Sequence, residues 1–313
     1  MELKQLNSLV AVAEAGFNVT EAAQRLFLVQ SAVSQHLARL EQELGTKLFV
    51  RRGKRLIGLS ASGEQVLAQA RQALAIRENI LAVGRDHVEE SSGELRIGTT
   101  HTQARYVLPA VIRAFRQGFP DVTLQIHQGT PQQLVEMALG DQVDFSICTE
   151  QLGEHPALHA IPIYRWNRCL IVPEGHPLVH EKPLSLERIC AHPLITYTFG
   201  FSGARHVQAT LARSGLRPNV VLSAVDADVI KTYVREGLGI GLIARAAYSP
   251  ELDQDLVLRD LSHLLPWETT WVAYRKDKFL RRFQQAFIET FDGMTTENGK
   301  TIVRRPGHAP AAP

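Results

Sequence analysis

Cysteine is scarce in this chain, and long apolar runs are missing from it. The 3 cysteines, Cys148, Cys169 and Cys190, show no C-x-x-C spacing, so the sequence predicts neither a disulfide framework nor a zinc site. The longest stretch without Lys, Arg, Asp or Glu, residues 189–204, is interrupted by proline and glycine, which excludes an ordinary transmembrane helix. We therefore expect no metal and no membrane contact.

The chain also lacks an excess of charge of one sign. Its 34 Lys and Arg against 32 Asp and Glu leave a net charge of +2, so binding to nucleic acid would need a local cluster of positive charge. The N-terminal segment MELKQLNSLVAVAEAG carries an acid and no cleavage site after an apolar core, unlike a signal peptide. A length of 313 residues with 45% apolar residues is typical of about two globular domains, and we expect a cytoplasmic protein.

Two short helices are predicted near the N-terminus. Thr20 can cap a helix that includes Ala23 and Leu26, and after a short break a second helix begins near Gln30. The apolar stripe of this second helix is Val33, Leu37, Leu40 and Leu44. The opposite face then presents Gln30, Ser31, Ser34 and Gln35. Short donors and acceptors at the start of a helix suit base reading in a DNA major groove, although a solvated helix face has the same composition.

A compact basic segment follows these helices. Residues 47–55, KLFVRRGKR, contain no acid and have a strand–turn–strand pattern around Gly53. Such a wing suits contact with phosphates. A charged run is usually only a solvated surface, but its position directly after a helix-turn-helix favours DNA binding.

A long helix is predicted next, over residues 60–88. Leu67, Leu74, Leu81 and Val88 stand seven residues apart, beside Val66, Ala73 and Ile80. This stripe predicts a partner helix from a second copy. The alternative is that the stripe packs on its own chain.

Beyond Gly93, short apolar strands alternate with amphipathic helices. The candidate strands are residues 95–98, 122–126, 143–148, 169–172, 194–197, 220–222 and 239–243, and the candidate helices include 107–115 and 133–139. Such alternation predicts an α/β region with parallel sheets, arranged as two similar lobes. The tail 295–313 is polar and rich in proline and glycine, so we expect it to be disordered.

The segment TEAAQRLFLVQSAVSQHLARLEQELGTKLFVRR resembles the winged helix-turn-helix of LysR-type transcriptional regulators. The resemblance implies a winged domain (1–58), a linker and dimerisation helix (59–90) and a two-lobed effector domain similar to periplasmic binding proteins (91–294). Lobe I would span about 91–163 and 268–292, and lobe II about 164–267. It also implies that Gln30, Ser31, Ser34 and Gln35 contact bases of promoter DNA and that Arg51 and Arg52 contact its backbone. A homotetramer built as a dimer of dimers, acting mainly as an activator with RNA polymerase, is the expected assembly.

Polar side chains gather where strands of the α/β region end. Residues 99–103, TTHTQ, lie where the first strand runs into a helix, a position at which backbone N–H groups and the helix dipole favour an anion. Thr149 follows another strand, and Ser202 lies in the glycine-rich turn 199–203. Ligands of open α/β sheets bind at such strand ends. Neutral donors suit a small anion or a carboxylate, although Thr100 or Thr102 could merely cap the helix.

Within the family, TTHTQARYVLPAVIRAF, TYTFGFSGAR and DADVIKTYVREGLGIGLIA resemble the regulators of cysteine biosynthesis and sulfur assimilation. This resemblance implies an effector pocket of Thr100, Thr102, Gln103, Thr149 and Ser202, bordered by Trp166. The implied effectors are N-acetylserine or O-acetylserine, with sulfate or thiosulfate, and neither a cofactor nor a catalytic residue is expected. Ser202 stands where threonine is expected, so a related regulator of sulfonate or sulfate-ester use is the alternative.

Several other patterns have a plain structural interpretation. Gly237, Gly239 and Gly241 miss the dinucleotide-binding spacing and suit a tight helix-to-strand turn. Buried cysteines usually behave as small apolar residues. His101 is expected to bond a backbone group, and Asp226 to cap a helix. Two further classes are weighed: a transport protein that binds sulfate-like anions, and a small-molecule transferase.

Overall fold

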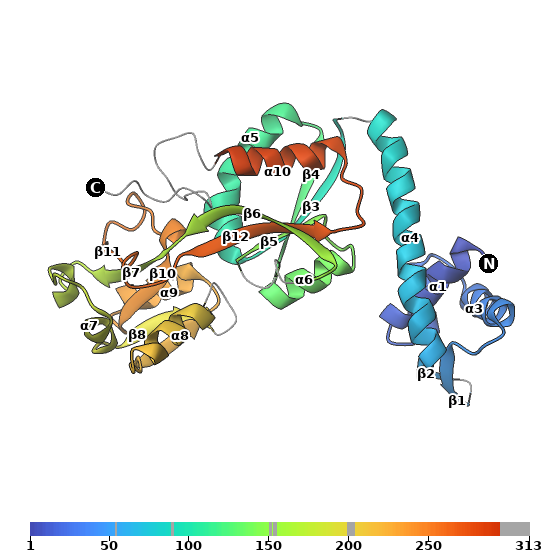
Figure 1. Cartoon of the computed structure of the whole chain (residues 1–313), viewed down its shortest axis with the longest axis horizontal. Coiled ribbons are helices and arrows are strands. Elements are labelled where there is room, and N and C mark those ends of the chain that lie inside the picture. Colours follow the sequence, from blue (N-terminus) through green and yellow to red (C-terminus); the bar gives the residue numbers. More distant parts are fainter. Residues whose placement is uncertain (54, 89–90, 150–151, 153–154, 199–203, 295–313) are drawn as a thin grey trace. The chain divides into compact units, whose positions relative to one another are not determined.

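The computed structural model describes residues 1–53, 55–88, 91–149, 152, 155–198 and 204–294 (Figure 1). The chain divides into two compact units, residues 1–88 with 277–279, and residues 89–276 with 280–313. Ser202 and the tail 295–313, for which the sequence makes predictions, lie outside the described residues.

The first unit is a small helical domain with a two-stranded wing. Helices α1 (Leu3–Glu14), α2 (Val19–Arg25) and α3 (Gln30–Leu44) precede strands β1 (Phe49–Arg52) and β2 (Arg55–Leu59), which pair antiparallel, and helix α4 (Ala61–Val88). Apolar side chains from the helices and the wing form one buried cluster, which includes Leu9, Val12, Val33, Leu37 and Leu48. This order of elements is that of the predicted winged helix-turn-helix.

Two local predictions in this domain are wrong. Asn18, rather than Thr20, caps α2, and its side chain accepts hydrogen bonds from the amides of Thr20 (3.1 Å) and Glu21 (3.2 Å). Asparagine and threonine are both good caps, so composition alone did not place the helix start. Leu44 is 40% exposed, and Glu41 is buried instead, because Gly45 adopts the left-handed conformation and ends α3 directly after Leu44.

Helix α4 packs on its own domain over its first half. Leu67 and Ala70 are buried in the cluster described above. A side chain at Gly63 would place its Cβ 2.0 Å from the carbonyl oxygen of Leu48, so glycine is required where the helix passes the wing. The exposed apolar side chains further along are Ile76, Ile80, Leu81 and Val83. The first half of α4 therefore packs on its own chain, and the prediction of a partner helix from a second copy concerns only the second half. The Val88 side chain, which belongs to the predicted stripe, lies outside the described residues.

Lobe I of the second unit is a five-stranded sheet with helices on both faces (Figure 1). Its strands lie in the order β4 (Val122–Gln128), β3 (Gly93–Thr99), β5 (Phe145–Cys148), β12 (Glu268–Arg275) and β6 (Leu158–Trp166). Helices α5 (Leu108–Gly118) and α10 (Arg282–Met294) bury a group of phenyl rings against one face, and α6 (Pro131–Leu139) packs on the other. A π-helical turn, η1 (Gln103–Val107), leads into α5.

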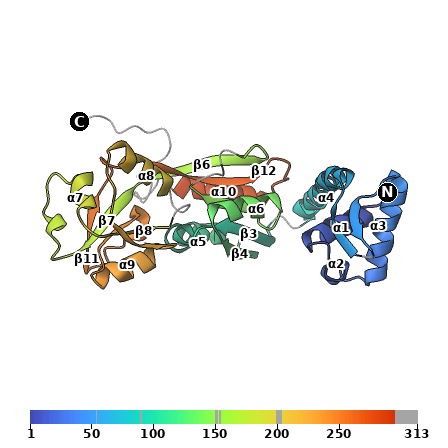
Figure 2. The same ribbon diagram turned by 90° about the horizontal axis from the view of Figure 1, so that it is seen from below.

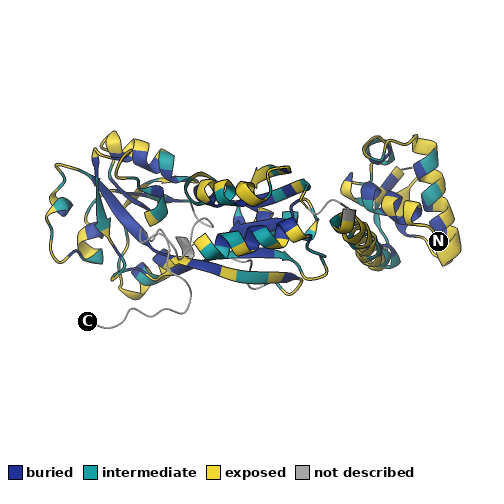
Figure 3. Ribbon diagram, turned by 90° about the horizontal axis from the view of Figure 1, so that it is seen from above, coloured by how far each residue is buried: buried dark blue, intermediate teal, exposed yellow. Residues whose placement is uncertain are grey.

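Lobe II repeats this three-layer plan. Its strands lie in the order β11 (Leu256–Asp260), β7 (Arg168–Pro173), β10 (Ile240–Ala244), β8 (Leu194–Tyr197) and β9 (Val220–Ala224). Helices α7 (Leu186–Cys190) and α8 (Ala204–Arg213) lie on the face opposite α9 (Ala227–Arg235) (Figure 2). Short 3-10 turns, η3 (Pro177–Val179) and η4 (Arg245–Ala247), complete the lobe. The inner strands β5, β7 and β10 are buried along nearly their whole length, whereas the edge strands β4 and β9 are mostly exposed (Figure 3).

The sheets are mixed, whereas the sequence predicted parallel ones. Strand β12 runs antiparallel to both β5 and β6, and β7 runs antiparallel to β10 and β11. The chain passes into lobe II between Trp166 and Arg168, slightly later than the predicted boundary at 163/164, because β6 remains in the lobe I sheet as far as Trp166.

The glycine run before β10 is structural. Gly237 has a positive φ of 76°, and a Cβ at Gly239 would lie 2.3 Å from the carbonyl oxygen of Pro193. The helix-to-strand turn therefore requires glycine at both positions, as the sequence interpretation had it.

Candidate functional site

The side chains predicted to read bases stand together on α3. Gln30, Ser31, Ser34 and Gln35 are all exposed. Val33 and Leu37, on the other side of the helix, are buried. No side chain caps the start of α3, where Val29 is the N-cap, so the first amides keep their donors and partial positive charge for phosphate. This end of α3 has the chemistry for docking in a major groove.

The turn before α3 is a feature that the sequence reasoning missed. Phe27 has a φ of 55° and a side chain that is 96% exposed, and Leu28 and Val29 are also exposed. Single exposed apolar residues are common, but a run of three beside a polar reading face enlarges the surface that DNA would cover. The sequence shows three apolar residues between the two predicted helices, but their exposure depends on the tertiary packing of α2 on α3 and could not be predicted from them.

The predicted phosphate contacts lie on the wing. Arg51 and Arg52 are exposed on β1, and Arg52 pairs opposite Arg55 across the hairpin. Arg51 is partly engaged within the domain, since its Nη2 lies 3.8 Å from the carboxylate of Glu41. For Arg52, no ion pair is formed among the described residues, so its charge is available to phosphate.

Glu41 connects the reading helix to the wing. Its buried carboxylate accepts hydrogen bonds from the Leu48 amide and from Lys47 Nζ, both at 3.0 Å. Burial alone would raise the pKa of the Glu41 carboxyl, but the bonds from Lys47 and Leu48 outweigh burial and hold this pKa below its ordinary value. Glu41 therefore stays charged and fixes α3 against the start of β1.

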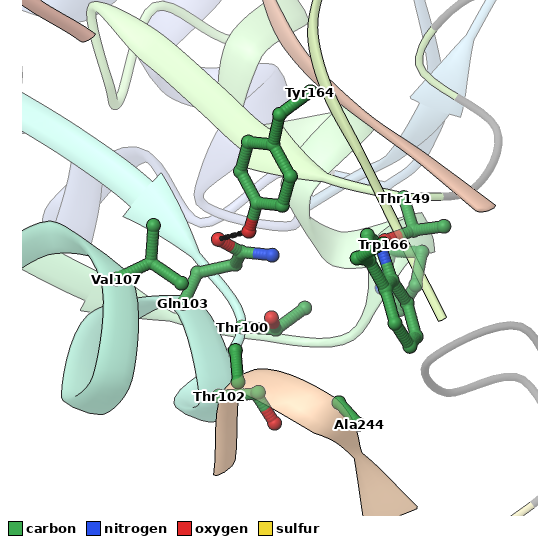
Figure 4. Close-up of a pocket in the computed structure, with 10 residues that line it drawn as sticks. Thr100, Thr102, Gln103, Val107, Thr149, Tyr164, Trp166 and Ala244 are labelled. Atoms are coloured by element: carbon green, nitrogen blue, oxygen red, sulfur yellow. Dashed lines mark hydrogen bonds between the residues drawn. The ribbon is translucent and has the colours of Figure 1, made fainter. Parts of the chain in front are cut away.

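A cavity between the two lobes contains most of the predicted effector residues (Figure 4). Lobe I contributes Thr100, Thr102, Gln103, Val107, Pro131, Thr149, Tyr164 and Trp166, and lobe II contributes Ala244 and Ala246. The space measures about 410 Å³, counting the part open to solvent. The structure thus brings Thr100, Thr102, Gln103, Thr149 and Trp166 together at the carboxyl ends of β3 and β5. Ser202 lies outside the described residues.

Hydrogen bonds within the cavity fix which atoms face a ligand. Tyr164 donates its hydroxyl proton to Gln103 Oε1 (2.5 Å), and Gln103 Nε2 donates to Thr270 Oγ1 (3.2 Å). One N–H of the Gln103 amide remains, and Figure 4 shows this nitrogen turned toward Thr149 and Trp166. Burial raises the pKa of Tyr164, so the phenol stays protonated and remains a donor.

Thr149 is prepared as a second donor. Trp166 Nε1 donates to Thr149 Oγ1 at 3.1 Å, and this leaves the hydroxyl proton of Thr149 for a ligand. No charged side chain lines the cavity among the described residues. A small anion could therefore be held by neutral donors and by the backbone at the start of the helix, while Val107, Pro131 and Ala244 supply apolar wall.

Tyr164 and the alanines of β10 and η4 were not predicted as lining residues. Tyr164 sits two residues before Trp166 on a strand that the sequence did not indicate, so the alternation of side chains along β6 was not available as a signal. Ala244 and Ala246 carry no chemistry that singles them out.

Of three smaller predictions, two are confirmed and one is wrong. Cys148 and Cys169 are buried, and burial raises the pKa of Cys169 to about 12, so they serve as apolar residues as expected. The expected backbone bond of His101 is wrong, because its buried Nδ1 has no hydrogen-bond partner among the described residues. Asp226 caps α9 as expected, and accepts a bond from the Val229 amide at 2.9 Å.

Known families match both parts of the chain. Residues 3–64 match the bacterial regulatory helix-turn-helix protein, lysR family, and residues 89–294 match the LysR substrate binding domain. The chain belongs to the LysR family of transcriptional regulators. This LysR-type regulator binds DNA through the winged domain, and its two-lobed part is the family's ligand-binding domain.

Close relatives of this LysR-type regulator share nearly its whole length. It is 44% identical to the HTH-type transcriptional regulator SsuR of Burkholderia cenocepacia over 93% of this chain and 94% of the relative. Identity to the HTH-type transcriptional regulator CysB of Haemophilus influenzae is 42%, over 95% and 92%. The crystal structure of the cofactor-binding domain of the Cbl transcriptional regulator is similar with a TM-score of 0.63 and 42% identity, over 68% of this chain and 91% of that one. Among the described residues, no helix is long and apolar enough to cross a bilayer.

Proposed function

We propose that this LysR-type regulator controls genes of cysteine biosynthesis and sulfur assimilation, mainly as an activator, by sensing small sulfur-related effectors. N-acetylserine or O-acetylserine binds in the cavity between the lobes, and sulfate or thiosulfate competes for the same donors. The observation that carries the proposal is the cavity itself, where Thr102, Gln103 and Thr149 present hydroxyl and amide groups without a charged neighbour in the lining. The 42% identity to CysB supports it.

The chemistry of acetylserine fits this lining. Its carboxylate can accept from the Gln103 amide and the Thr149 hydroxyl, and its acetyl methyl can rest on Val107 or Ala244. Sulfate offers the same acceptor oxygens without an apolar group, so it would use the donors and leave the apolar wall uncovered. Binding is reversible, and the protein does not turn the effector over.

DNA control requires more than one copy. Two copies would pair through the exposed apolar half of α4, around Ile76, Ile80 and Leu81. Two such dimers form the tetramer, which places paired winged domains on an inverted-repeat promoter in the cytoplasm, beside RNA polymerase. Effector binding biases the closure of the lobes, which repacks the tetramer and changes the spacing of the winged domains. Identical DNA footprints with and without bound effector would contradict this mechanism.

Calorimetric titration of the full-length protein tests the pocket. N-acetylserine, O-acetylserine, sulfate and thiosulfate are titrated into wild type, Thr102→Ala and Thr123→Ala, the last an exposed threonine on β4 that serves as the control. Saturable acetylserine binding by wild type and control, weakened about ten-fold or more in Thr102→Ala, is expected for loss of a hydrogen bond to a charged group. No binding of any of these compounds by the folded protein would refute the effector assignment, and release of acetate from O-acetylserine would indicate an enzyme.

A related regulator of sulfonate or sulfate-ester use is the second candidate. The observation that favours it is Ser202, where the resemblance to sulfur regulators leads us to expect threonine. Binding of sulfate-like anions without binding of either acetylserine would favour this candidate. A transport protein for such anions is disfavoured by the helix-turn-helix match over residues 3–64.

A further inference from the structure

Side chains of the turn η1 contact both the effector cavity and lobe II. Gln103 and Val107, at its two ends, line the cavity. Arg105 and Tyr106, between them, instead contact helix α9 of lobe II. π-helical turns are rare and frequently mark functional sites. A single turn of backbone therefore carries pocket donors and an inter-lobe contact.

Tyr106 belongs to lobe I in sequence but packs on the core of lobe II. Its ring lies against the buried cluster that includes Ala227, Ile230 and Val234. Its hydroxyl donates to Asp228 Oδ1 at 2.5 Å and accepts from Lys231 Nζ at 3.3 Å.

The groups that hold Tyr106 are themselves fixed. Lys231 is 4% exposed and is paired with the buried Asp253 at 2.8 Å. Asp228 lies in the first turn of α9, where the helix dipole favours a carboxylate. Arg105 Nε contacts the second oxygen of Asp228 at 2.8 Å. The two oxygens of one lobe II carboxylate thus hold two neighbouring residues of η1.

We propose that Asp228 is a positioning residue for the effector pocket, which clamps η1 to lobe II through Arg105 and Tyr106 and so holds Thr102 and Gln103 in place for the ligand. The proposal rests on the proposed function, because it assigns a role in effector binding to that cavity. When the clamp is intact, the donors are ordered before the ligand arrives, and less ordering opposes binding. When the clamp is broken, the ligand must order the turn itself.

A cation site is the competing interpretation of the same residues. His101, Asp226 and Asp228 bring possible ligand atoms within 4.8 Å of one another, and His101 Nε2 lies 3.9 Å from Asp228 Oδ2. However, both Asp228 oxygens already accept bonds, and the guanidinium of Arg105 opposes a second positive charge beside that carboxylate. The Asp228 carboxylate is therefore better suited to hold Arg105 and Tyr106 than to bind a cation.

The test is a double-mutant cycle on effector affinity in the full-length protein. Asp228→Asn and Arg105→Gln are measured singly and together by calorimetry with N-acetylserine and with sulfate. Each single change is expected to weaken binding about five- to ten-fold, since a charge-assisted bond is lost. The double variant is expected to be no weaker than the weaker single, because the two groups act as one contact. If the losses of affinity in the two single variants instead multiply in the double variant, the two residues act independently and the clamp is overturned.

Matched controls separate the clamp from general damage to α9. Glu236→Gln changes an exposed carboxylate at the end of that helix, and Tyr233→Phe removes a hydroxyl from an exposed tyrosine. Both are expected to bind like wild type, whereas Tyr106→Phe weakens binding. Equal losses in Tyr106→Phe and Tyr233→Phe would overturn the proposal. Binding that is lost on dialysis against EDTA and restored by Zn²⁺ would also overturn it in favour of a cation site.

A ligand-free measurement distinguishes failure of the clamp from failure of the proposed function. Hydrogen exchange of the amides of residues 103–107 is expected to accelerate at least several-fold in Asp228→Asn and to stay unchanged in Glu236→Gln. If wild type binds neither compound but exchange accelerates, the effector assignment fails and the clamp on η1 stands. If exchange of these amides is unchanged in Asp228→Asn, the clamp is refuted, even where wild type binds the effectors normally.

Discussion

The ion pair between Arg168 and Glu268 allows a prediction of large magnitude. Arg168 Nη1 lies 3.0 Å from Glu268 Oε1, and the two side chains are 1% and 3% exposed. At an effective dielectric constant of about 20 their attraction is roughly 5 kcal/mol, most of which offsets the loss of hydration. Glu268→Ala keeps the cost of burying the guanidinium and removes the facing carboxylate. We expect the free energy of unfolding to fall by about 3 to 5 kcal/mol.

Tryptophan fluorescence during urea unfolding measures this effect in the right domain. All 3 tryptophans of the chain, Trp166, Trp267 and Trp271, lie in the two-lobed part, so their emission reports its unfolding and not that of the winged domain. With a urea dependence of about 2 kcal/mol per molar, the midpoint should fall by roughly 1.5 to 2.5 M.

An exposed ion pair of similar geometry provides the control. Arg188 Nε lies 2.8 Å from Glu181, with side chains 55% and 29% exposed, so Arg188→Ala should lower stability by less than about 1 kcal/mol. A Glu268→Ala midpoint no lower than that of Arg188→Ala would refute the reasoning from burial. The double change Arg168→Met with Glu268→Leu should recover most of the loss, because apolar residues of similar size avoid the buried charge.

Three further predictions concern the winged domain. Alanine at Arg51 and Arg52 should weaken binding to all DNA sequences and reduce the slope of log affinity against log salt by about 1 to 2 per wing; an anisotropy titration with an unchanged slope would remove both residues from the phosphate interface. Gln35→Ala should change the preferred operator base at a cost of about 1 to 3 kcal/mol, and an equal loss on random DNA would argue against base reading. The pKa of Glu41 is lower in the folded protein than in the unfolded chain. The charged Glu41 carboxylate therefore stabilises the fold at pH values above its unfolded-state pKa, and this stabilisation is lost as the pH falls through its folded-state pKa. The protection factor of the Leu48 amide, which is its intrinsic exchange rate divided by the rate observed at the same pH, should thus fall on acidification from about pH 6 to 3 in wild type. Glu41→Gln should show a weaker pH dependence of this protection factor, and equal profiles would contradict the assignment.

The parts that the sequence predicted well depend on local patterns. The reading face of α3 follows from helical periodicity alone, and the basic hairpin is a continuous run of letters. The burial of Glu41 could not be predicted, because a carboxylate is buried only when distant donors such as the Leu48 amide satisfy it.

The cavity was predictable only in part for the same reason. Thr100 and Thr149 follow strand ends, where ligands of α/β sheets bind. Tyr164 and Ala244 reach the cavity through tertiary closure of β6 and β10, for which no local signal exists. Strand direction was missed because β12 enters the lobe I sheet from more than a hundred residues downstream of β6, and periodicity does not encode direction.

The chain passes from lobe I to lobe II and back again at neighbouring positions on the lobe I sheet. Trp166, the last residue of β6, pairs opposite Glu268, the first residue of β12. Neighbouring antiparallel strands whose ends stand opposite each other can be joined by a turn of about two to five residues. The whole of lobe II is thus carried in the loop of a β-hairpin, and its removal would leave every strand of lobe I paired as before. A new sensing lobe could therefore be grafted as a cassette at this hairpin without redesign of the sheet that carries it.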